Sequence, residues 1–259
     1  MLTFHHSGTS GDLLSSLPAI KYLGGGRLLL HLFNIGSPGR MNATDLEFLE
    51  PLLLNTGYIT EFRDYRYDDN IDYNLDQFRM FYERSNFDSL ISSHFLAIGC
   101  QEFLTNKKLQ REVYLKPFLK VNKVKKVTGK YIGVSRTVRH RNGSPDNHYF
   151  WKRIIDDGLE EVGLFFGLPE EHRFFEETFN IKIEFVPTDN ALELAEYIAG
   201  VECFVCSASM NYWIATGLSK TTMLETRQVH PLDTQKWSRN ECNNHRPNGF
   251  VMPFGEYRE

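Results

Sequence analysis

The chain has 259 residues, of which 41% are hydrophobic and 14% aromatic, and this composition is typical of a folded globular protein rather than a disordered one. No run approaches the roughly 20 apolar residues of a bilayer-spanning helix. The first residues lack the basic start and apolar core of a secretory signal, so we expect a cytoplasmic protein without a membrane span. The formal net charge of −4 hides an asymmetry, because residues 107–141 contain twelve Lys or Arg residues and one acid.

The first half of the chain alternates between strands and helices. We predict, in order, a strand over 1–6, a helix over 12–23, a strand over 26–34, a helix over 44–57 and a strand over 58–65. Thr44 or Asp45 is the expected cap of the second helix. The run at 26–34 is continuously apolar, as strands buried in a parallel sheet are. This order predicts a doubly wound α/β unit.

The same alternation resumes after a basic segment at 118–130. We predict a strand over 131–137, helices over 148–163 and 170–180, a strand over 181–186, a helix over 190–200, a strand over 201–208, a helix over 211–218 and a strand over 220–226. This is a second α/β unit, and we place the boundary between residues 125 and 126. Two such units generally bind a ligand in the cleft between them, near the carboxyl ends of the strands.

Several common site motifs are missing from the sequence. It has no Gly-x-Gly-x-x-Gly after the first strand and no GxxxxGK[ST], which disfavours a dinucleotide dehydrogenase and a P-loop NTPase. The nine histidines form no HExxH, and Cys203 and Cys206 lie in an apolar run where we expect buried thiols. We therefore predict no protein-bound metal.

Three segments occur in the order found in the ADP-heptose:lipopolysaccharide heptosyltransferases. Residues 10–23, "SGDLLSSLPAIKYL", resemble the family's first loop and helix, and residues 148–158 resemble its Trp-bearing helix. Residues 189–220 resemble the helix, strand, small-residue loop and helix that cradle the sugar nucleotide. The resemblance implies a GT-B fold of two Rossmann-like domains facing a cleft. Residues 1–125 would form the acceptor-side domain, and residues 126–259 the nucleotide-sugar-binding domain.

The chain departs from the family before its last predicted helix. Where the family usually has Asp-Ser-Gly-Pro-x-His, this chain has "ASMNYW", so Ala208 replaces the acid and Trp213 the histidine. Side-chain contacts to the donor must therefore differ. The backbone amides of residues 209–211 would still point outward at a helix N-terminus and bind a diphosphate.

Asp12 follows the first strand and matches the family's general base. The resemblance implies that it removes a proton from the acceptor hydroxyl as that oxygen attacks the anomeric carbon. From the residues alone, an Asp here is also a good helix cap, whose charge a helix N-terminus favours. The residues of the loop beside it are expected to contact acceptor or phosphate oxygens, or simply to form a turn: Ser7, Thr9, Ser10 and Gly11.

Three arginines, Arg136, Arg139 and Arg141, follow the first strand of the second unit. Guanidinium groups clamp phosphates bidentately and stabilise a departing diphosphate without a metal, although arginines in a loop can also be plain surface residues. The acidic stretch at 67–76 we interpret instead as a solvated loop or helix cap. Further expected donor contacts, each with a structural alternative as cap or core, are Glu171, Asp189, Ser207, Ser209, Asn211 and Trp213.

Together these features predict a metal-independent inverting glycosyltransferase that uses a nucleotide-diphosphate sugar as co-substrate and no cofactor. Its acceptor would be a surface glycan, as in the family. Hydroxylated DNA bases are an alternative acceptor, because the basic segment at 107–141 suits a polyanion as well as a solvated surface. A non-catalytic sugar-nucleotide-binding protein is a third possibility, since the motif at 208–213 is altered.

Overall fold

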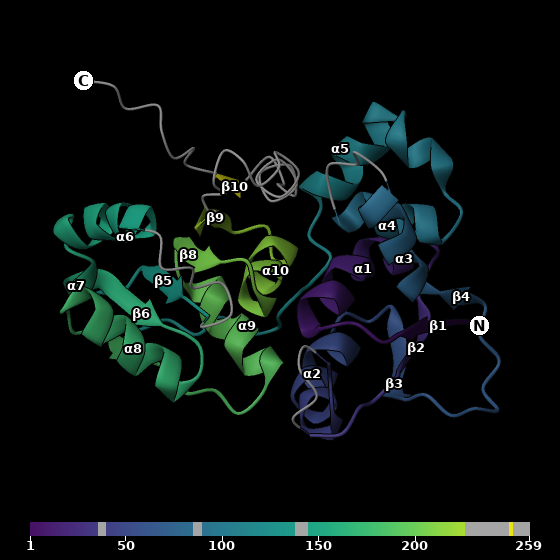
Figure 1. The fold of residues 1–259 in the computed structure, drawn as a ribbon, viewed down its shortest axis with the longest axis horizontal. Coiled ribbons are helices and arrows are strands. Elements are labelled where there is room, and N and C mark those ends of the chain that lie inside the picture. The colour runs from purple at the N-terminus through teal and green to yellow at the C-terminus, as the bar shows by residue number, and fades with distance from the viewer. Residues whose placement is uncertain (36–39, 85–89, 138–144, 226–248, 251–259) are drawn as a thin grey trace.

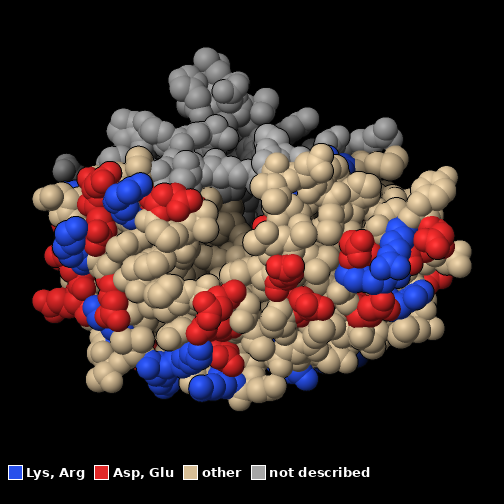
Figure 2. All heavy atoms as spheres, turned by 90° about the horizontal axis from the view of Figure 1, so that it is seen from below, with Lys and Arg blue, Asp and Glu red and all other residues tan. Residues whose placement is uncertain are grey.

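The computed structural model describes the chain except residues 36–39, 85–89, 138–144, 226–248 and 251–259, and the side chains of residues 82–84, 145–149 and 249–250. The described residues form two parallel β-sheets, one in each half of the chain, with helices beside both (Figure 1). From below, the surface is hollowed between the halves, and the described residues around the hollow are mostly uncharged (Figure 2). The predicted α/β class is confirmed.

The sheet of the first half has the strand order β3-β2-β1-β4. Its strands are β1 (Leu2–His6), β2 (Gly26–Leu30), β3 (Ile59–Asp64) and β4 (Tyr73–Asn74). Its helices are α1 (Ser10–Tyr22), α2 (Ala43–Asn55), α3 (Phe78–Arg84), α4 (Leu90–Ala97) and α5 (Lys107–Leu115), with short 3₁₀ turns η1 (Leu75–Gln77) and η2 (Gln101–Leu104). All pairings are parallel, so the carboxyl ends of the four strands meet at one edge.

The sheet of the second half has the order β10-β9-β8-β5-β6-β7, again with parallel pairings. Its strands are β5 (Ile132–Ser135), β6 (Gly163–Phe165), β7 (Glu184–Phe185), β8 (Cys203–Ser207), β9 (Thr221–Glu225) and β10 (Gly249–Phe250). Its helices are α6 (Pro145–Asp156), α7 (Leu159–Val162), α8 (Pro169–Phe179), α9 (Ala191–Gly200) and α10 (Met210–Gly217). Trp151 of α6 is fully buried and packs edge-on against Phe175 of α8, with ring centroids 5.0 Å apart.

Side-chain caps determine where the helices of the first half begin. Thr9 caps α1 and Asn42 caps α2, and in both helices the third residue is an Asp that binds back to the N–H of the cap. This is a capping box, which satisfies two amide groups that the helix leaves unpaired. The predicted cap of α2, Thr44 or Asp45, is therefore wrong by two or three residues. The N-cap is Asn42, and Asp45 accepts a hydrogen bond from the N–H of Asn42.

The two halves share one hydrophobic cluster, which runs from Phe4 on β1 to Trp213 on α10. Helix α1 packs against α10, and α2 packs against α9. The segment that joins the halves adds hydrogen bonds from the N–H groups of Phe118 and Leu119 to the carbonyl oxygen of Gly217, both 3.0 Å long. Apolar packing and these bonds hold the two sets of strand ends in a defined relation to each other.

Several elements differ from their predicted extent. The predicted helix over 148–163 divides into α6 and α7, and the predicted strand over 26–34 ends at Leu30. Helices α3 to α5 and strands β4, β6 and β10 are not predicted at all. No strand or helix lies between residues 116 and 131, all of which are described, and the predicted domain boundary falls in that connection.

Candidate functional site

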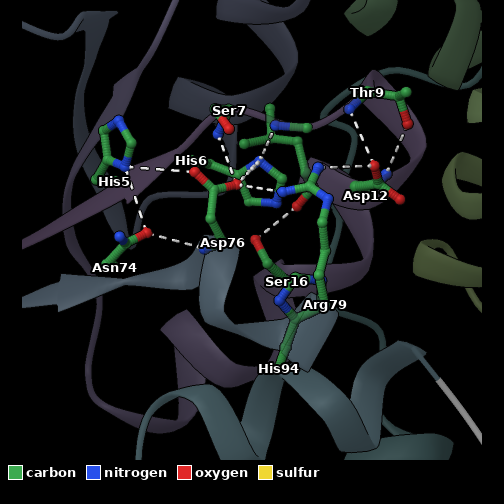
Figure 3. A network of polar contacts seen from close by, with 12 residues as sticks. His5, His6, Ser7, Thr9, Asp12, Ser16, Asn74, Asp76, Arg79 and His94 are labelled. Carbon is green, nitrogen blue, oxygen red and sulfur yellow. Dashed lines mark hydrogen bonds and ion pairs between the residues drawn. The ribbon is translucent and has the colours of Figure 1, made fainter. Parts of the chain in front are cut away.

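Polar side chains gather where the strands of the first half end (Figure 3). His5 and His6 are the last residues of β1, Asp12 lies in the first turn of α1, and Asp76 lies in η1 directly after β4. Arg79 reaches them from α3. Because β1 is paired with β4, residues 69 positions apart, such as Ser7 and Asp76, come together at this edge.

Asp12 is held by one of its two carboxylate oxygens. Its Oδ2 accepts a hydrogen bond from the N–H of Thr9 at 3.0 Å and lies 3.6 Å from Nη2 of Arg79. Its own N–H donates to Oγ1 of Thr9 at 3.3 Å. Among the described residues, Oδ1 makes no hydrogen bond or ion pair, and the side chain is 23% exposed. Asp12 thus completes a helix cap and still presents one oxygen.

Arg79 joins Asp12 to a second carboxylate. Its Nη1 donates to Oδ1 of Asp76 at 2.8 Å, and its guanidinium lies over the ring of Phe78, 4.8 Å from the centroid. The side chain is 35% exposed, so this is a partly solvated contact whose contribution to stability is small. The ion pair of Arg79 with Asp12 helps to fix the position of Oδ2 of Asp12.

Asp76 collects contacts from three directions. Its Oδ1 accepts from the N–H of Ser7 at 3.0 Å, and its Oδ2 lies 3.6 Å from Nδ1 of His5. Burial acts to raise the pKa of Asp76, but the attraction of the His6 ring, which is charged only in acid, and hydrogen bonds from Ser7 and Arg79 outweigh it and leave this pKa below its ordinary value. Asp76 is therefore ionised at neutral pH and suited to orienting Arg79.

Two fully buried histidines lie behind this network. Nδ1 of His6 accepts from the N–H of Gly8 at 2.8 Å, and Nε2 of His94 lies 3.1 Å from Oγ of Ser15. Burial lowers the pKa of His6 to about 4, against the opposing attraction of Asp76 and Asp12. Burial likewise lowers the pKa of His94 well below its usual value. Both rings are therefore neutral at pH 7 and contribute to this edge by packing rather than by charge.

The four predicted residues of the acceptor-side loop lie at this edge. Ser7 binds Asp76 through its N–H and accepts from Nη1 of Arg40 through its carbonyl at 2.9 Å. Thr9 is the cap, and Ser10 and Gly11 open α1. A Cβ added to Gly11 would lie 3.4 Å from Cδ1 of Trp213 on α10. The start of α1 therefore meets the second half of the molecule.

In the second half, two predicted donor residues, Ser207 and Asn211, bind residues at the end of β5. Oγ of Ser207 accepts from the N–H of Thr137 at 3.0 Å, and Nδ2 of Asn211 donates to Oγ of Ser135 at 2.8 Å. Both side chains are buried. These bonds hold the carboxyl ends of β5 and β8 and the start of α10 together. The two side chains therefore belong to the edge of the second sheet that would face a donor.

The N-terminus of α10, like those of α7 and α8, has no side-chain cap among the described residues. Ser209 stands at its N-cap, yet within the part of the chain that the structure describes it makes no side-chain capping bond. Its Oγ is buried and has no partner among those residues. The first amide groups of an α-helix have no intrahelical acceptor, so an anion would complete this end.

Arg136 is buried and paired with Glu225 at the end of β9. Its Nε lies 3.1 Å and 3.0 Å from the two carboxylate oxygens, and its Nη2 lies 3.0 Å from Oε1. Both side chains are at most 5% exposed. The pair neutralises the charge that the sequence suggests for phosphate binding. Arg139 and Arg141 lie outside the described residues.

The remaining predicted donor residues have structural contacts. Trp213 is buried against the start of α1, and Glu171 binds the N–H of Leu168 through Oε2 at 3.1 Å. Asp189 is exposed and precedes Asn190, the cap of α9. The donor-binding roles assigned to these three residues stay predictions.

Sequence reasoning misses Asp76, Arg79 and the two buried histidines. Asp76 belongs to the acidic stretch interpreted as a solvated loop or helix cap, but its side chain is only 19% exposed and it faces β1. The available signal was the alternation of Tyr73 and Leu75 with polar residues, which is too short to stand out. Arg79 and His94 have no sequence signal, because only the fold brings them beside Asp12.

No group of three or more His, Cys, Asp or Glu residues in the described ranges is arranged to hold a metal ion. Cys100, Cys203 and Cys206 are free thiols, and burial raises the pKa of Cys206 well above its usual value. None of the helices in the described part of the chain is both long and apolar enough to cross a membrane.

Solved glycosyltransferase structures have a similar fold. The chain aligns over 97% of its length with 85% of the glycosyl transferase family 9 protein from Veillonella parvula DSM 2008, at a TM-score of 0.51 and 9% identity. It aligns over 99% of its length with 65% of TibC, an iron-containing dodecameric glycosyltransferase from enterotoxigenic E. coli H10407, at a TM-score of 0.55 and 12% identity. E. coli heptosyltransferase WaaC with ADP-2-deoxy-2-fluoro heptose gives a TM-score of 0.47 at 12% identity, over 97% of this chain and 92% of that one.

No protein-family model and no curated protein matches the sequence. The structural likeness nevertheless confirms the predicted GT-B type of fold and the resemblance to heptosyltransferase-like glycosyltransferases at the level of architecture. At 9% and 12% identity, it is the fold that these structures share with the chain.

Proposed function

We propose that the chain is a metal-independent, inverting glycosyltransferase that moves a sugar from a nucleotide-diphosphate sugar to an acceptor hydroxyl. The observation that carries this proposal is the contact between the start of α1 and α10, where Gly11 lies beside Trp213. This contact supports a site in which Asp12, the candidate base, lies close to the helix whose N-terminus would hold the diphosphate.

The proposed reaction is a single displacement. Oδ1 of Asp12 takes the proton of the acceptor hydroxyl while that oxygen attacks the anomeric carbon, and the bond to the diphosphate breaks on the opposite face. The configuration of the sugar inverts because there is one displacement. Thr9 and Arg79 hold Oδ2 of Asp12, which supports the presentation of Oδ1 to the acceptor.

The departing diphosphate accumulates negative charge that the second half would stabilise. The amides of residues 209–211 are the donors we assign to it, and the unpartnered Oγ of Ser209 adds one hydroxyl at the same place. Arg139 and Arg141 are the cations we assign to the diphosphate. We assign a structural role to Arg136 instead, because its guanidinium already binds Glu225.

A glycan acceptor is favoured over DNA by the contacts of the basic segment. Lys116 pairs with Glu112, Lys125 with Glu193 and Glu196, and Lys130 lies 3.8 Å from Glu184. These pairs neutralise part of the positive charge that a polyanion would need. Acceptor binding should therefore depend only weakly on salt, and a steep loss of binding with rising ionic strength would favour a DNA acceptor.

The first test is a thermal-shift screen of sugar nucleotides and nucleoside diphosphates. A ligand at 100 times its Kd adds about 2.7 kcal/mol to the free energy of unfolding. We expect one nucleobase to give a clear shift and its sugar nucleotide to release nucleoside diphosphate on incubation. A screen without any shift would contradict the proposal, and binding without turnover would indicate a non-catalytic binding protein.

A matched pair of variants tests where the diphosphate binds. Ser209→Asp and Ser209→Asn both supply a good cap for α10, but only Asp places a negative charge where the diphosphate would lie. We expect Ser209→Asp to lose nucleotide binding and Ser209→Asn to retain more of it, with both proteins folded. Equal affinity in the two variants would place the diphosphate elsewhere.

A further inference from the structure

A cluster of aromatic rings lies at the strand ends of the first half, next to the network that contains Asp12. It consists of His5, His31, Phe33 and Tyr65, which we call the aromatic platform. His31 and Tyr65 are stacked with centroids 6.3 Å apart, and His5 meets Tyr65 edge-on at 4.8 Å. His31 also contacts Phe33 at 4.8 Å. His31 is exposed, so the middle of the platform faces solvent.

Backbone hydrogen bonds fix the platform to the sheet. The N–H of His31 donates to the carbonyl of His6, and the N–H of Tyr65 to the carbonyl of Leu30, both at 2.9 Å. The N–H of Phe33 donates to the carbonyl of Met41 at the same distance. These bonds hold the main chain that carries the rings, so little backbone freedom is lost when a ligand stacks on the platform, which favours binding.

The platform and Asp12 are the two ends of one continuous set of contacts. His5 lies 3.6 Å from Asp76, Asp76 binds Arg79, and Arg79 lies 3.6 Å from Asp12. Figure 3 shows His5 and Asp12 on opposite sides of Asp76 and Arg79. A ligand on the platform would therefore extend along the same edge toward the proposed base.

The surrounding charges indicate the chemistry of that ligand. Residues 61–76 contain six Asp or Glu residues and two Arg. Arg63 pairs with Glu61 and Asp69, Arg79 pairs with Asp76, and Arg40 lies over Phe33 at 4.9 Å, so carboxylates still outnumber the cations. A phosphate backbone needs many Lys or Arg contacts and would be repelled by this excess of carboxylates. Hydroxyl groups, in contrast, donate hydrogen bonds to carboxylates, and the negative face of an aromatic ring attracts the C–H groups of a sugar ring.

We propose that the aromatic platform binds an uncharged hexopyranose ring of the acceptor, by stacking of the apolar face of the sugar on His31 and Tyr65. This inference rests on the proposed glycosyltransferase function and names the substrate class of its acceptor side. It assigns to the platform the recognition of the acceptor, and leaves proton removal to Asp12.

The test is saturation-transfer difference NMR on the full chain with neutral sugars as probes: the methyl glycosides of glucose, galactose and mannose, with maltose and lactose. We expect saturation of the ring C–H protons of at least one probe. Tyr65→Ala and His31→Ala should weaken its binding by about tenfold, whereas Tyr65→Phe, which keeps the ring, should retain it. Tyr67→Ala is the matched control, because Tyr67 is 98% exposed in the same loop and contributes to no ring pair of the platform.

Melting temperatures and nucleoside-diphosphate shifts are measured on the same samples. If a nucleotide binds but no sugar does, or if sugar binding is equal in all variants, the platform is not a sugar site and the inference is wrong while the proposed function stands. If sugars show the expected pattern but no nucleotide binds, the proposed function fails and the platform remains a sugar site. Binding of an oligothymidylate that is lost in Tyr65→Ala would overturn the inference in favour of nucleic acid.

Discussion

The strand ends of the two halves use polar side chains in opposite ways. In the first half, Asp12, Asp76 and Arg79 form a partly exposed network in which one carboxylate oxygen of Asp12 stays uncommitted among the described residues. In the second half, Arg136 and Glu225 bury their charges against each other, and Ser207 and Asn211 bond to neighbouring strand ends. The edge of the first sheet thus presents a partly exposed carboxylate, whereas the edge of the second sheet is held in place by buried polar bonds.

The largest effect should come from removing the carboxylate of Asp12. Asp12→Asn keeps the shape and can still accept from Thr9, so stability should hardly change. Release of nucleoside diphosphate from the donor found by screening should fall by about 100 to 10,000-fold, because Asn cannot take a proton. Donor binding should persist.

Asp45 provides the control for this change. It occupies the equivalent capping position of α2, where its Oδ2 accepts from the N–H of Asn42 at 2.9 Å. Asp45→Asn should have a similarly small effect on melting temperature and none on turnover. A fully active Asp12→Asn protein would show that Asp12 only caps α1. The polar network of the first half would then be structural, like that of the second half.

Breaking the buried ion pair should have the largest effect on stability. Arg136→Ala leaves Glu225 charged, buried and unpaired, and such changes cost about 3–5 kcal/mol of the free energy of unfolding. Replacing both residues, Arg136→Met with Glu225→Leu, should recover much of that loss. Urea denaturation of the three proteins measures it. A stable Arg136→Ala protein with weakened nucleotide binding would instead make Arg136 a phosphate ligand.

The buried histidines should make the first half sensitive to acid. His6 has a pKa of about 4 when folded and 6.5 ordinarily, so between these values the unfolded chain binds more protons than the folded one. Stability should therefore fall as the pH drops from about 6.5 toward 4, by about 3 kcal/mol for His6 alone. His94 acts in the same direction.

Urea denaturation between pH 7 and pH 4.5 measures this loss. His6→Asn offers an uncharged acceptor to the N–H of Gly8 and should flatten the profile. Asp76, whose pKa is lowered from 3.8, affects stability only at still lower pH, so its contribution is separable. A wild-type stability that is constant over this range would contradict the neutral burial of both rings.

Much of the fold follows from local patterns, and the site follows only in part. Apolar runs and helix periodicity are enough to predict the two parallel sheets, and the loop before α1 is enough to place Asp12 at a strand end. The sequence favours Asp12 as the cap of α1 over Thr9, three positions earlier, although both Thr and Asp are good caps and only the hydrogen bonds distinguish them.

The parts that sequence reasoning misses are pairings between distant positions. Strand β4 has two residues and β6 has three, too few to show a period of two. Arg136 and Glu225 are 89 positions apart, so no local pattern reveals that the cation is already paired. A cluster of arginines in a sequence therefore predicts an anion site only when the partners of each cation are known.

The smallest expected effect distinguishes two glycines of the first loop. A Cβ at Gly8 would lie 2.4 Å from Cε1 of His6 and 2.8 Å from Cβ of Asp12, which is closer than any ordinary contact. Gly8→Ala must therefore push the His6 ring or the start of α1 aside, and overpacking of this kind costs about 1–3 kcal/mol. Gly11→Ala is the control, because its Cβ would meet Trp213 at 3.4 Å, an ordinary van der Waals distance, and it should be nearly neutral. Chemical denaturation measures both. Equal stabilities of the two variants would mean that the strand ends of the first half are less tightly packed than their contacts indicate. A loss of stability confined to Gly8→Ala would show that the residues around Asp12 are rigid and closely packed.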